Sequence, residues 1–357
     1  MMRTLNIGNR AVGKNEPTYF IADVGANHDG DIGRAKQLIH LAAESGADAA
    51  KFQNFQAPKI VSKYGFEAMG AQLDHQASWK KSVYETYADA SLPWEWTETL
   101  KAECDAVGIE YFSSPYDEEA VDMLDPFVNA HKIGSGDITW MEILRKISST
   151  DKVVILSTGG SNILDVQRAV HEILSVNSKL ILLQCNTNYT GNITNLKHVH
   201  LNVLKTYEVM FPDVILGLSD HTPGHASVLG AVALGGTVIE KHFTDDTNRD
   251  GPDHPFSMTP VTWRDMVNRT RELEHALGSA DKRVADNEKD TVVVQRRCIR
   301  VAGPLDRGVV LEREHLTVLR PAPSDAISPY EIEKVVGMRL NTQLPEGEAL
   351  RWDMLER

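Results

Sequence analysis

Short apolar segments alternate with longer amphipathic segments along most of the chain. In one of the longer segments Ala35, Leu38, Ile39 and Ala42 recur at the spacing of one helix face, and Gly46 follows as a typical stop. The short segments are rich in β-branched residues and have no polar face, which is typical of strands buried on both sides. We expect eight such strands, at residues 19–25, 47–53, 110–115, 130–137, 152–160, 180–188, 214–220 and 237–243.

Eight strands, most of them followed by a helical segment over roughly 280 residues, predict an α/β fold of the (β/α)8 TIM-barrel type. A doubly wound open sheet is the alternative, but no G-x-G-x-x-G sequence follows the first strand. In a TIM barrel the active site lies at the carboxyl ends of the strands. Polar residues at those ends are therefore the candidate functional residues.

The domain organisation follows from changes in this pattern. Residues 63–93 are too long for a simple strand-to-helix connection, so we expect an additional helix or a loop over the strand ends; the alternative is a surface excursion without a role. Beyond the last helix, a charged stretch precedes short β-like pieces separated by Pro and Gly. The predicted domains are a barrel over 1–282, a linker over 283–295 and a small β-rich domain over 296–357.

The composition narrows the class of protein. The 357 residues carry a formal net charge of −13, which argues against nucleic acid or an anionic membrane as the main partner. The three cysteines are far apart in the sequence, so we expect no disulfide framework and a reducing, cytoplasmic location. The first residues do not resemble a signal peptide, and no apolar run is long enough to span a membrane.

Two histidines point to a metal site. His221 follows one apolar run and His242 closes the next, so we expect both imidazoles at the same ends of two neighbouring parallel strands. A single histidine there is usually a satisfied polar residue, but two neutral imidazoles can bind a divalent metal and leave positions open for substrate. Asp220, Asp245 and Asp246 lie close by in sequence.

The other strand ends also carry polar residues, and two of these are lysines within apolar strands. Lys51 and Lys132 are costly to bury without partners. One interpretation is an internal ion pair with Asp23 or Glu240. The other is a phosphate or carboxylate pocket, completed by hydroxyl groups and by the glycine-rich turns GSG and TGG. The hydroxyls in question belong to Ser135, Ser157 and Ser219.

These motifs resemble those of the sialic acid synthases, the N-acetylneuraminate and related nonulosonate synthases. The matching segments are YFIADVGANHDG, GADAAKFQNF, YFSSPYD, HKIGSGD, ILSTGG, GLSDHTPG, VIEKHFT and GPDHPFSM, in the family's order. The sequences RRCIRVAGPLDRG, TVLRPA and ISPYE are similar to the antifreeze-like (SAF) domain that ends these synthases. The resemblance implies a TIM barrel with a C-terminal SAF domain. It also implies a domain-swapped homodimer in which each small domain covers the partner's barrel.

The resemblance further implies a reaction. The family condenses phosphoenolpyruvate with an N-acetylated aminohexose, such as N-acetylmannosamine, to give a nine-carbon 2-keto acid and phosphate. Legionaminic or pseudaminic acid synthesis from a 2,4-diacetamido-trideoxyhexose stays open. An amidohydrolase-like hydrolase or a class II aldolase needs more metal ligands than this chain offers, and a non-catalytic descendant predicts the loss of ligands that are all present here.

Site residues carry over motif by motif. His221 and His242 would bind a divalent ion, typically Mn²⁺, with Mg²⁺ or Co²⁺ also possible. Asp23 and Lys51 would join them in catalysis, although the family usually has Glu where Asp23 stands. Phosphoenolpyruvate would be held by Lys51, Lys132, Ser135, Ser157, Thr187 and Ser219, and the sugar by Gln53, Tyr189, Asp253 and Arg320. Further departures are NHDG where the family has NHNG, CNTNYTGN at the sixth strand end, and the long 63–93 stretch.

Overall fold

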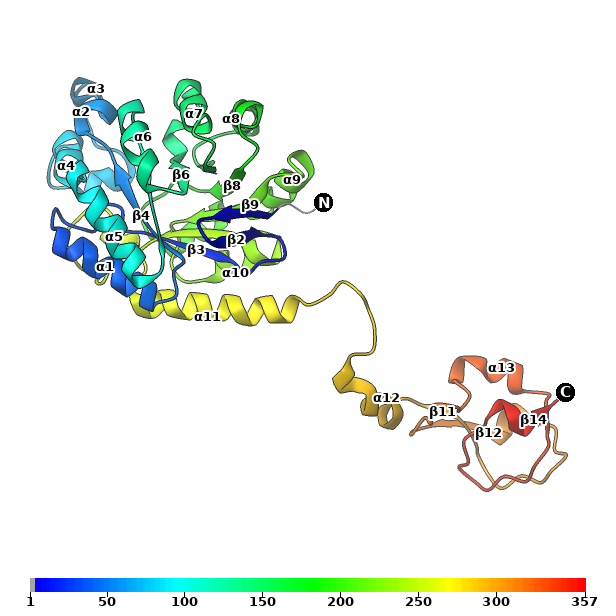
Figure 1. Cartoon of the computed structure of the whole chain (residues 1–357). Coiled ribbons are helices and arrows are strands. Elements are labelled where there is room, and N and C mark those ends of the chain that lie inside the picture. Colours follow the sequence, from blue (N-terminus) through cyan, green and yellow to red (C-terminus); the bar gives the residue numbers. More distant parts are fainter. Residues whose placement is uncertain (1–3) are drawn as a thin grey trace. The chain divides into compact units, whose positions relative to one another are not determined.

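The chain forms two compact units, Met1–Gly278 and Ser279–Arg357 (Figure 1). The computed structural model describes residues 4–357, without the side chains of Asp74 and Ser78. The division after Gly278 comes shortly before the segment expected to be a linker. That segment contains a 3-10 helix, η7 (Asp286–Glu288), and helix α12 (Lys289–Gln295).

The first unit is built on eight strands in the order β5-β4-β3-β10-β9-β8-β7-β6. Every pairing along this order is parallel, and the end strands β5 and β6 lie next to each other, so the sheet closes into a barrel. The predicted TIM barrel is confirmed, and each predicted strand overlaps one of these: β3 (Tyr19–Asp23), β4 (Ala49–Asn54), β5 (Glu110–Pro115), β6 (Ala130–Ile133), β7 (Val153–Ser157), β8 (Leu180–Cys185), β9 (Ile215–Asp220) and β10 (Val238–His242).

Helices surround the barrel strands, as Figure 1 shows. They bury the apolar faces that the sequence pattern predicts; in α1 these are Ala35, Leu38, Ile39 and Ala42. The carboxylate of Asp31 caps the start of α1 by accepting from two backbone N–H groups. The α-helices of this unit outside residues 57–96 are α1 (Ile32–Glu44), α5 (Thr97–Val107), α6 (Glu118–Leu124), α7 (Met141–Ser148), α8 (Ile163–Val176), α9 (Val203–Met210), α10 (Ala226–Ala233) and α11 (Pro260–Leu277).

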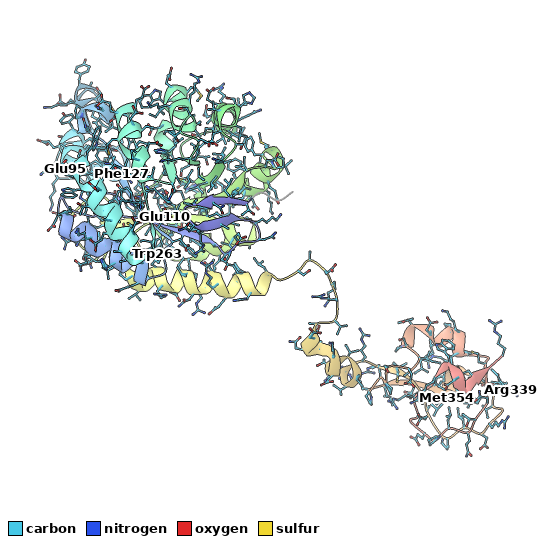
Figure 2. The ribbon with its side chains drawn as sticks, in the orientation of Figure 1. Glu95, Glu110, Phe127, Trp263, Arg339 and Met354 are labelled. Carbon is cyan, nitrogen blue, oxygen red and sulfur yellow. The ribbon has the colours of Figure 1, made fainter. Side chains whose placement is uncertain are left out.

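The last barrel helix is fixed to the strands by a buried aromatic pair. Trp263 of α11 is fully buried, and its ring meets that of Phe243 edge-on at a centroid distance of 5.5 Å. Figure 2 shows Trp263 where α11 meets the barrel. None of the helices that the structure describes in residues 4–357 is long and apolar enough to cross a membrane.

An N-terminal hairpin was not predicted. β1 (Thr4–Ile7) and β2 (Arg10–Gly13) pair antiparallel, and Gly8 takes the left-handed conformation in the turn between them. Each strand has only four residues, too few for a clear alternation of polar and apolar positions. Ile7 and Val12 nevertheless join the barrel's hydrophobic core.

Several short helices fill the long connection between β4 and α5. They are α2 (Ala57–Ile60), α3 (Lys63–Ala68), η1 (Asp74–Ser78), α4 (Val83–Ala90) and η2 (Trp94–Trp96). Helix α4 begins with a capping box in which Ser82 and Glu85 each bond the other's backbone N–H. The expectation of an additional helix or a loop within 63–93 is therefore met by helices, and residues of this connection line the pocket described below.

The second unit has a small hydrophobic core of its own. Its strands are β11 (Cys298–Val301), β12 (Leu316–Leu319), β13 (Arg339–Leu340) and β14 (Leu355–Glu356), with α13 (Ile332–Val335) and the 3-10 helices η8 (Arg313–His315), η9 (Pro329–Glu331) and η10 (Trp352–Met354). Its buried core includes Ile299, Val301, Leu316, Val335 and Leu350. The unit therefore has the β-rich character predicted for the C-terminal part, with a thin core typical of small domains.

Candidate active site at the carboxyl ends of the barrel strands

The two predicted histidines lie side by side. His242 is the last residue of β10 and His221 directly follows β9, and because these strands pair in parallel both rings stand at the same edge of the barrel. Their centroids are 5.6 Å apart. The sequence-based expectation of paired imidazoles at neighbouring strand ends matches this geometry.

Both imidazoles suit metal binding. His221 Nδ1 lies 3.0 Å from the backbone oxygen of Asn186, so this nitrogen donates and Nε2 keeps a free lone pair. Burial, together with the neighbouring His242, lowers the pKa of His221 to about 4, which keeps the ring neutral at pH 7. His242 Nδ1 is buried and has no hydrogen-bond partner among the described residues. Two imidazoles, one with a free lone pair and one with an unsatisfied buried nitrogen, form a donor set that fits a divalent transition metal.

The acids near His242 are not the ones nearest in sequence. Its Nε2 lies 3.3 Å from the Asp23 carboxylate and its Nδ1 lies 3.7 Å from that of Asp253. Asp245 instead pairs with Arg34 of α1. Asp220, next to His221 in sequence, is bound by Lys241, Thr222 and Ser227.

Asp23 is the centre of the first polar cluster. Strand register places it beside both Lys51 and His242. Lys51 Nζ donates to Asp23 Oδ2 at 2.7 Å, Gln53 Nε2 donates to the same oxygen at 3.1 Å, and the N–H of Gly25 donates to Oδ1 at 3.0 Å. Burial opposes ionisation of this acid, but Lys51 and His242 outweigh it and lower the pKa of Asp23. The carboxylate is thus held ionised in the barrel interior.

Lys132 belongs to a second cluster. Its Nζ lies 3.3 Å from Glu240 Oε1, and the Ser219 hydroxyl donates to that same oxygen at 3.1 Å. Both buried lysines therefore form the internal ion pairs that were one of the two interpretations. Hydrogen-bonding capacity is left over, because Glu240 Oε2 and the Ser157 hydroxyl are buried without a partner among the described residues. In native proteins such atoms usually meet a ligand or water.

Ser135 and Thr187 meet at the glycine-rich turn after β7. The Ser135 hydroxyl accepts from the N–H of Gly159 at 3.0 Å. A Cβ on Gly159 would lie 2.5 Å from the Thr187 methyl carbon, so only glycine fits there. Cys185 lies beside Ser135 and Ser219, and burial raises the pKa of its thiol to about 11, so it stays protonated at pH 7.

A pocket that is partly open to solvent adjoins His242. Gln53, Tyr189, His242 and Asp253, all predicted site residues, contribute to its lining. The Tyr189 ring packs on that of His221 at a centroid distance of 4.4 Å. The remaining lining residues are Ala26, Phe55, Ile60, His75, Trp79, Thr86, Tyr87, Ala90, Tyr116 and Pro252.

Several residues at this site were missed by the sequence analysis. Phe256 packs against the rings of His242 and Tyr189, at 4.9 and 5.3 Å. Asp137 ends the HKIGSGD motif, and burial raises its pKa to about 6 against the opposing charge of Lys132. The position of Asp137 in that motif was a usable signal. Phe256 lies in the GPDHPFSM segment, which was an equally usable signal, although a phenylalanine there is also typical of ordinary packing.

The second unit contains the remaining predicted site residue. Arg320 follows β12, is exposed, and forms no ion pair within the part of the chain that the structure describes.

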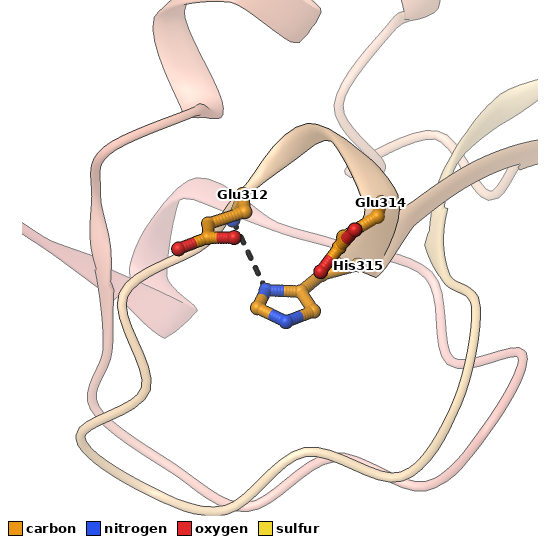
Figure 3. Close-up of side chains that lie close together, drawn as sticks. All are labelled: Glu312, Glu314 and His315. Atoms are coloured by element: carbon orange, nitrogen blue, oxygen red, sulfur yellow. Dashed lines mark hydrogen bonds between the residues drawn. The ribbon is translucent and has the colours of Figure 1, made fainter.

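Among the residues that the structure describes, one group of three side chains of types that can bind a metal ion converges: Glu312, Glu314 and His315 (Figure 3). His315 Nδ1 already accepts the N–H of Glu312 at 3.0 Å, so the group is explained as the cap of η8.

Comparisons with known proteins agree with the architecture. A model of the NeuB family matches residues 38–282 and a model of the SAF domain matches residues 296–356. N,N'-diacetyllegionaminic acid synthase of Legionella pneumophila is 35% identical over 96% of this chain and 96% of its own length. N-acetylneuraminate-9-phosphate synthase of Homo sapiens is 30% identical over 97% of this chain and 95% of its own length.

Solved structures extend the agreement to the whole fold. A putative spore coat polysaccharide biosynthesis protein E from Chromobacterium violaceum superposes with a TM-score of 0.75 at 25% identity. The superposition covers 95% of this chain and 100% of the Chromobacterium violaceum chain. The order of motifs, the closed barrel and the C-terminal unit therefore lead to one assignment: the chain is an enzyme that belongs to the NeuB family of synthases and ends in a SAF domain.

Proposed function

We propose that this enzyme condenses phosphoenolpyruvate with an N-acetylated aminohexose, N-acetylmannosamine or a relative, to give a nine-carbon 2-keto sugar acid and phosphate. The alternative acceptors are the 2,4-diacetamido-trideoxyhexoses that lead to legionaminic or pseudaminic acid. The observation that carries the proposal is the pair of neighbouring histidines between two different environments. On one side lie buried lysines and hydroxyls that suit an anion, and on the other an aromatic pocket that suits a sugar ring.

The anion side would bind phosphoenolpyruvate. Lys51 and Lys132 supply two ammonium groups, and Ser135, Ser157 and Ser219 supply hydroxyl donors; Thr187 stands at the same turn as Ser135. Ser157, with its unpartnered hydroxyl, is the donor most ready to take a phosphate or carboxylate oxygen. Each lysine would then be shared between its internal carboxylate and the substrate.

The sugar side would hold the acceptor with its aldehyde toward the histidines. Gln53, Tyr189 and Asp253 line this pocket. Asp253 Oδ2 is fixed by the N–H of Ala26 at 2.9 Å, which presents the carboxylate to the pocket in one orientation. We further propose that the chain forms a domain-swapped homodimer in which Arg320 of each SAF unit reaches the sugar bound by the other subunit.

His221 and His242 would hold a divalent ion, Mn²⁺ in first place, and such an ion acts as a Lewis acid on a carbonyl oxygen. The chain's own residues account for the other steps. C3 of phosphoenolpyruvate attacks the aldehyde carbon, and the positive charge that develops at C2 lies in a site rich in carboxylates. Water adds at C2, and one of its protons passes by way of the Asp23 carboxylate, which Lys51 keeps ionised, to the oxygen of the former aldehyde. The tetrahedral intermediate then forms the C2 carbonyl and expels phosphate, which takes up the proton of the C2 hydroxyl group.

The test is phosphate release from phosphoenolpyruvate with Mn²⁺, run with N-acetylmannosamine, its 6-phosphate and the 2,4-diacetamido-trideoxyhexoses. We expect release with at least one sugar, none without sugar, and loss on chelation. His221→Ala should abolish release, whereas His225→Ala, at a partly exposed histidine that pairs with Asp265, should not. Turnover that resists chelation would contradict the metal role, and no release with any sugar would contradict the proposed reaction.

A further inference from the structure

A buried polar network lies behind the two histidines, on the outer side of strands β9 and β10. Its members are Asp220, Thr222, Ser227 and Lys241. We propose that this network positions the imidazoles of His221 and His242 for metal binding. Its members act through the histidines and are not among the described residues that line the pocket. The inference rests on the proposed function, because it takes the two imidazoles to be the metal ligands.

Strand register and alternation place the ion pair at the centre of this network. Lys241 and Asp220 stand opposite each other where β10 pairs with β9. The residues on either side of Lys241 are Glu240 and His242, whose side chains contact other residues inside the barrel. Because successive side chains of a strand point to opposite faces, Lys241 points outward, toward the helix layer. Both members of the pair are 1% exposed.

Asp220 fixes the turn that carries His221. Its Oδ1 accepts the backbone N–H of Thr222 at 3.1 Å and the Thr222 hydroxyl at 2.9 Å. Its Oδ2 accepts the hydroxyl of Ser227, a buried residue of α10, at 2.6 Å. An aspartate that accepts the N–H two residues further on holds a turn in one conformation. Asp220 and Thr222 are the chain neighbours of His221, so the backbone is held on both sides of that imidazole.

Lys241 joins this turn to the strand that ends in His242. Its Nζ donates to the carboxylate of Asp220 and, at 2.6 Å, to the backbone oxygen of Thr222. Lys241 directly precedes His242 in the chain. One ammonium group therefore links the backbone beside one imidazole to both chain neighbours of the other. Groups behind a ligand that fix its orientation in this way govern metal affinity.

Stability alone is a weak explanation for the ion pair. Taking two charges out of water costs about as much free energy as their attraction returns, so two uncharged side chains of similar size often serve the fold equally well. The contacts of Lys241 and Asp220 described above fall on the turn that bears His221 and on the helix that follows it. This placement favours a positioning role.

The experiment measures Mn²⁺ binding to the full chain without substrates, from the electron paramagnetic resonance signal of free Mn²⁺. The variant is Lys241→Met combined with Asp220→Asn, which removes both charges at once and leaves none buried without a partner. The Kd for Mn²⁺ should rise at least about tenfold, while the far-ultraviolet circular dichroism stays unchanged. An unchanged Kd in the folded double variant would overturn the inference.

The single variant separates positioning from stability. Lys241→Met alone leaves Asp220 buried without its ammonium partner, so it should unfold at a lower urea concentration than the double variant. A purely structural pair predicts that Mn²⁺ affinity recovers with the urea midpoint in the double variant, whereas a positioning role predicts that only the midpoint recovers. Ile147→Ala, at a fully buried position of α7, is the control: its midpoint should fall and its Kd should not change. Equally weak Mn²⁺ binding in this control would assign the effect to general destabilisation.

A milder variant decides the matter if the double variant does not fold. Thr222→Val keeps the branched shape of the side chain and removes only the hydroxyl that donates to Asp220. Its Kd for Mn²⁺ should rise at least about threefold, and an unchanged value would contradict the inference. Wild-type protein that binds no Mn²⁺, or binds it as well as His221→Ala does, would overturn the metal role and this inference with it. Binding that needs His221 but not the network would overturn this inference alone.

Discussion

Replacing Lys51 by methionine would remove the ammonium group that pairs with Asp23 inside the barrel. The two side chains are 2% and 3% exposed, and their charged atoms are 2.7 Å apart. Removing one member of a buried pair typically costs about 3–5 kcal/mol, because the other charge is left without compensation. Asp23 would keep the hydrogen bonds from Gly25 and Gln53, so we expect the low end, a loss of about 3 kcal/mol in the free energy of unfolding at pH 8.

The loss in free energy of unfolding caused by Lys51→Met should depend on pH in a defined direction. In the native protein the pKa of Asp23 is lowered, so the pair stabilises the fold above the pKa of an unfolded aspartate, about 3.9, and that contribution is lost only as pH falls through the lower folded value. Without Lys51, burial dominates and raises the pKa of Asp23 in the folded variant. The folded variant then takes up a proton, so its penalty shrinks as pH falls from 8 toward 5, by at most about 1.4 kcal/mol per pH unit.

The assay is urea unfolding followed by tryptophan fluorescence at pH 8, 6.5 and 5. Of the 6 tryptophans only Trp352 lies outside the barrel unit, so the signal reports the barrel. Lys101→Met is the matched control, because Lys101 pairs with Asp105 at the surface and such pairs contribute under about 1 kcal/mol. A double variant with Asp23→Asn should recover part of the loss. A cost below about 1 kcal/mol at pH 8, or one that does not change with pH, would refute the reasoning.

Three further substitutions test the site. His242→Ala should abolish Mn²⁺-dependent phosphate release while far-ultraviolet circular dichroism stays unchanged; an active variant that resists chelation would exclude the metal role. Arg320→Ala should raise the KM of the sugar about tenfold and that of phosphoenolpyruvate little, and equal effects on both would count against a sugar contact. Gly25→Ala should also raise the sugar KM about tenfold, because its Cβ would lie 2.5 Å from Asp253 Oδ2. Gly30→Ala is its control, since Gly30 is also left-handed but has open space around it; a similar change in the control would assign the effect to backbone strain.

The barrel could be predicted because its strands are encoded locally. Each strand is a short apolar run between polar turns, so the eight strands appear in the sequence without knowledge of their partners. The N-terminal hairpin escaped because four-residue strands carry too little pattern. The same local encoding shows which chemical groups stand at the strand ends, including His221 and His242.

The sequence did not show which side chains pair with those groups. From the sequence, Lys51 and Lys132 could form ion pairs or hold a substrate, and only strand register shows that Lys51 stands beside Asp23. Nearness in sequence was misleading for His242, whose carboxylate neighbours are Asp23 and Asp253.

The sequence by itself determined the fold class and the kinds of side chain at the barrel mouth. These depend on hydrophobic period and residue type, which are local properties of the chain. The tertiary structure alone decided which charges are paired and which side chains line the pocket beside His242. Phe55 and Tyr87 come from the connection between β4 and α5, whereas Tyr189 follows β8, and closure of the barrel brings all three to one pocket. Pocket shape and pairing depend on contacts between residues far apart in the chain, and no local pattern encodes those contacts.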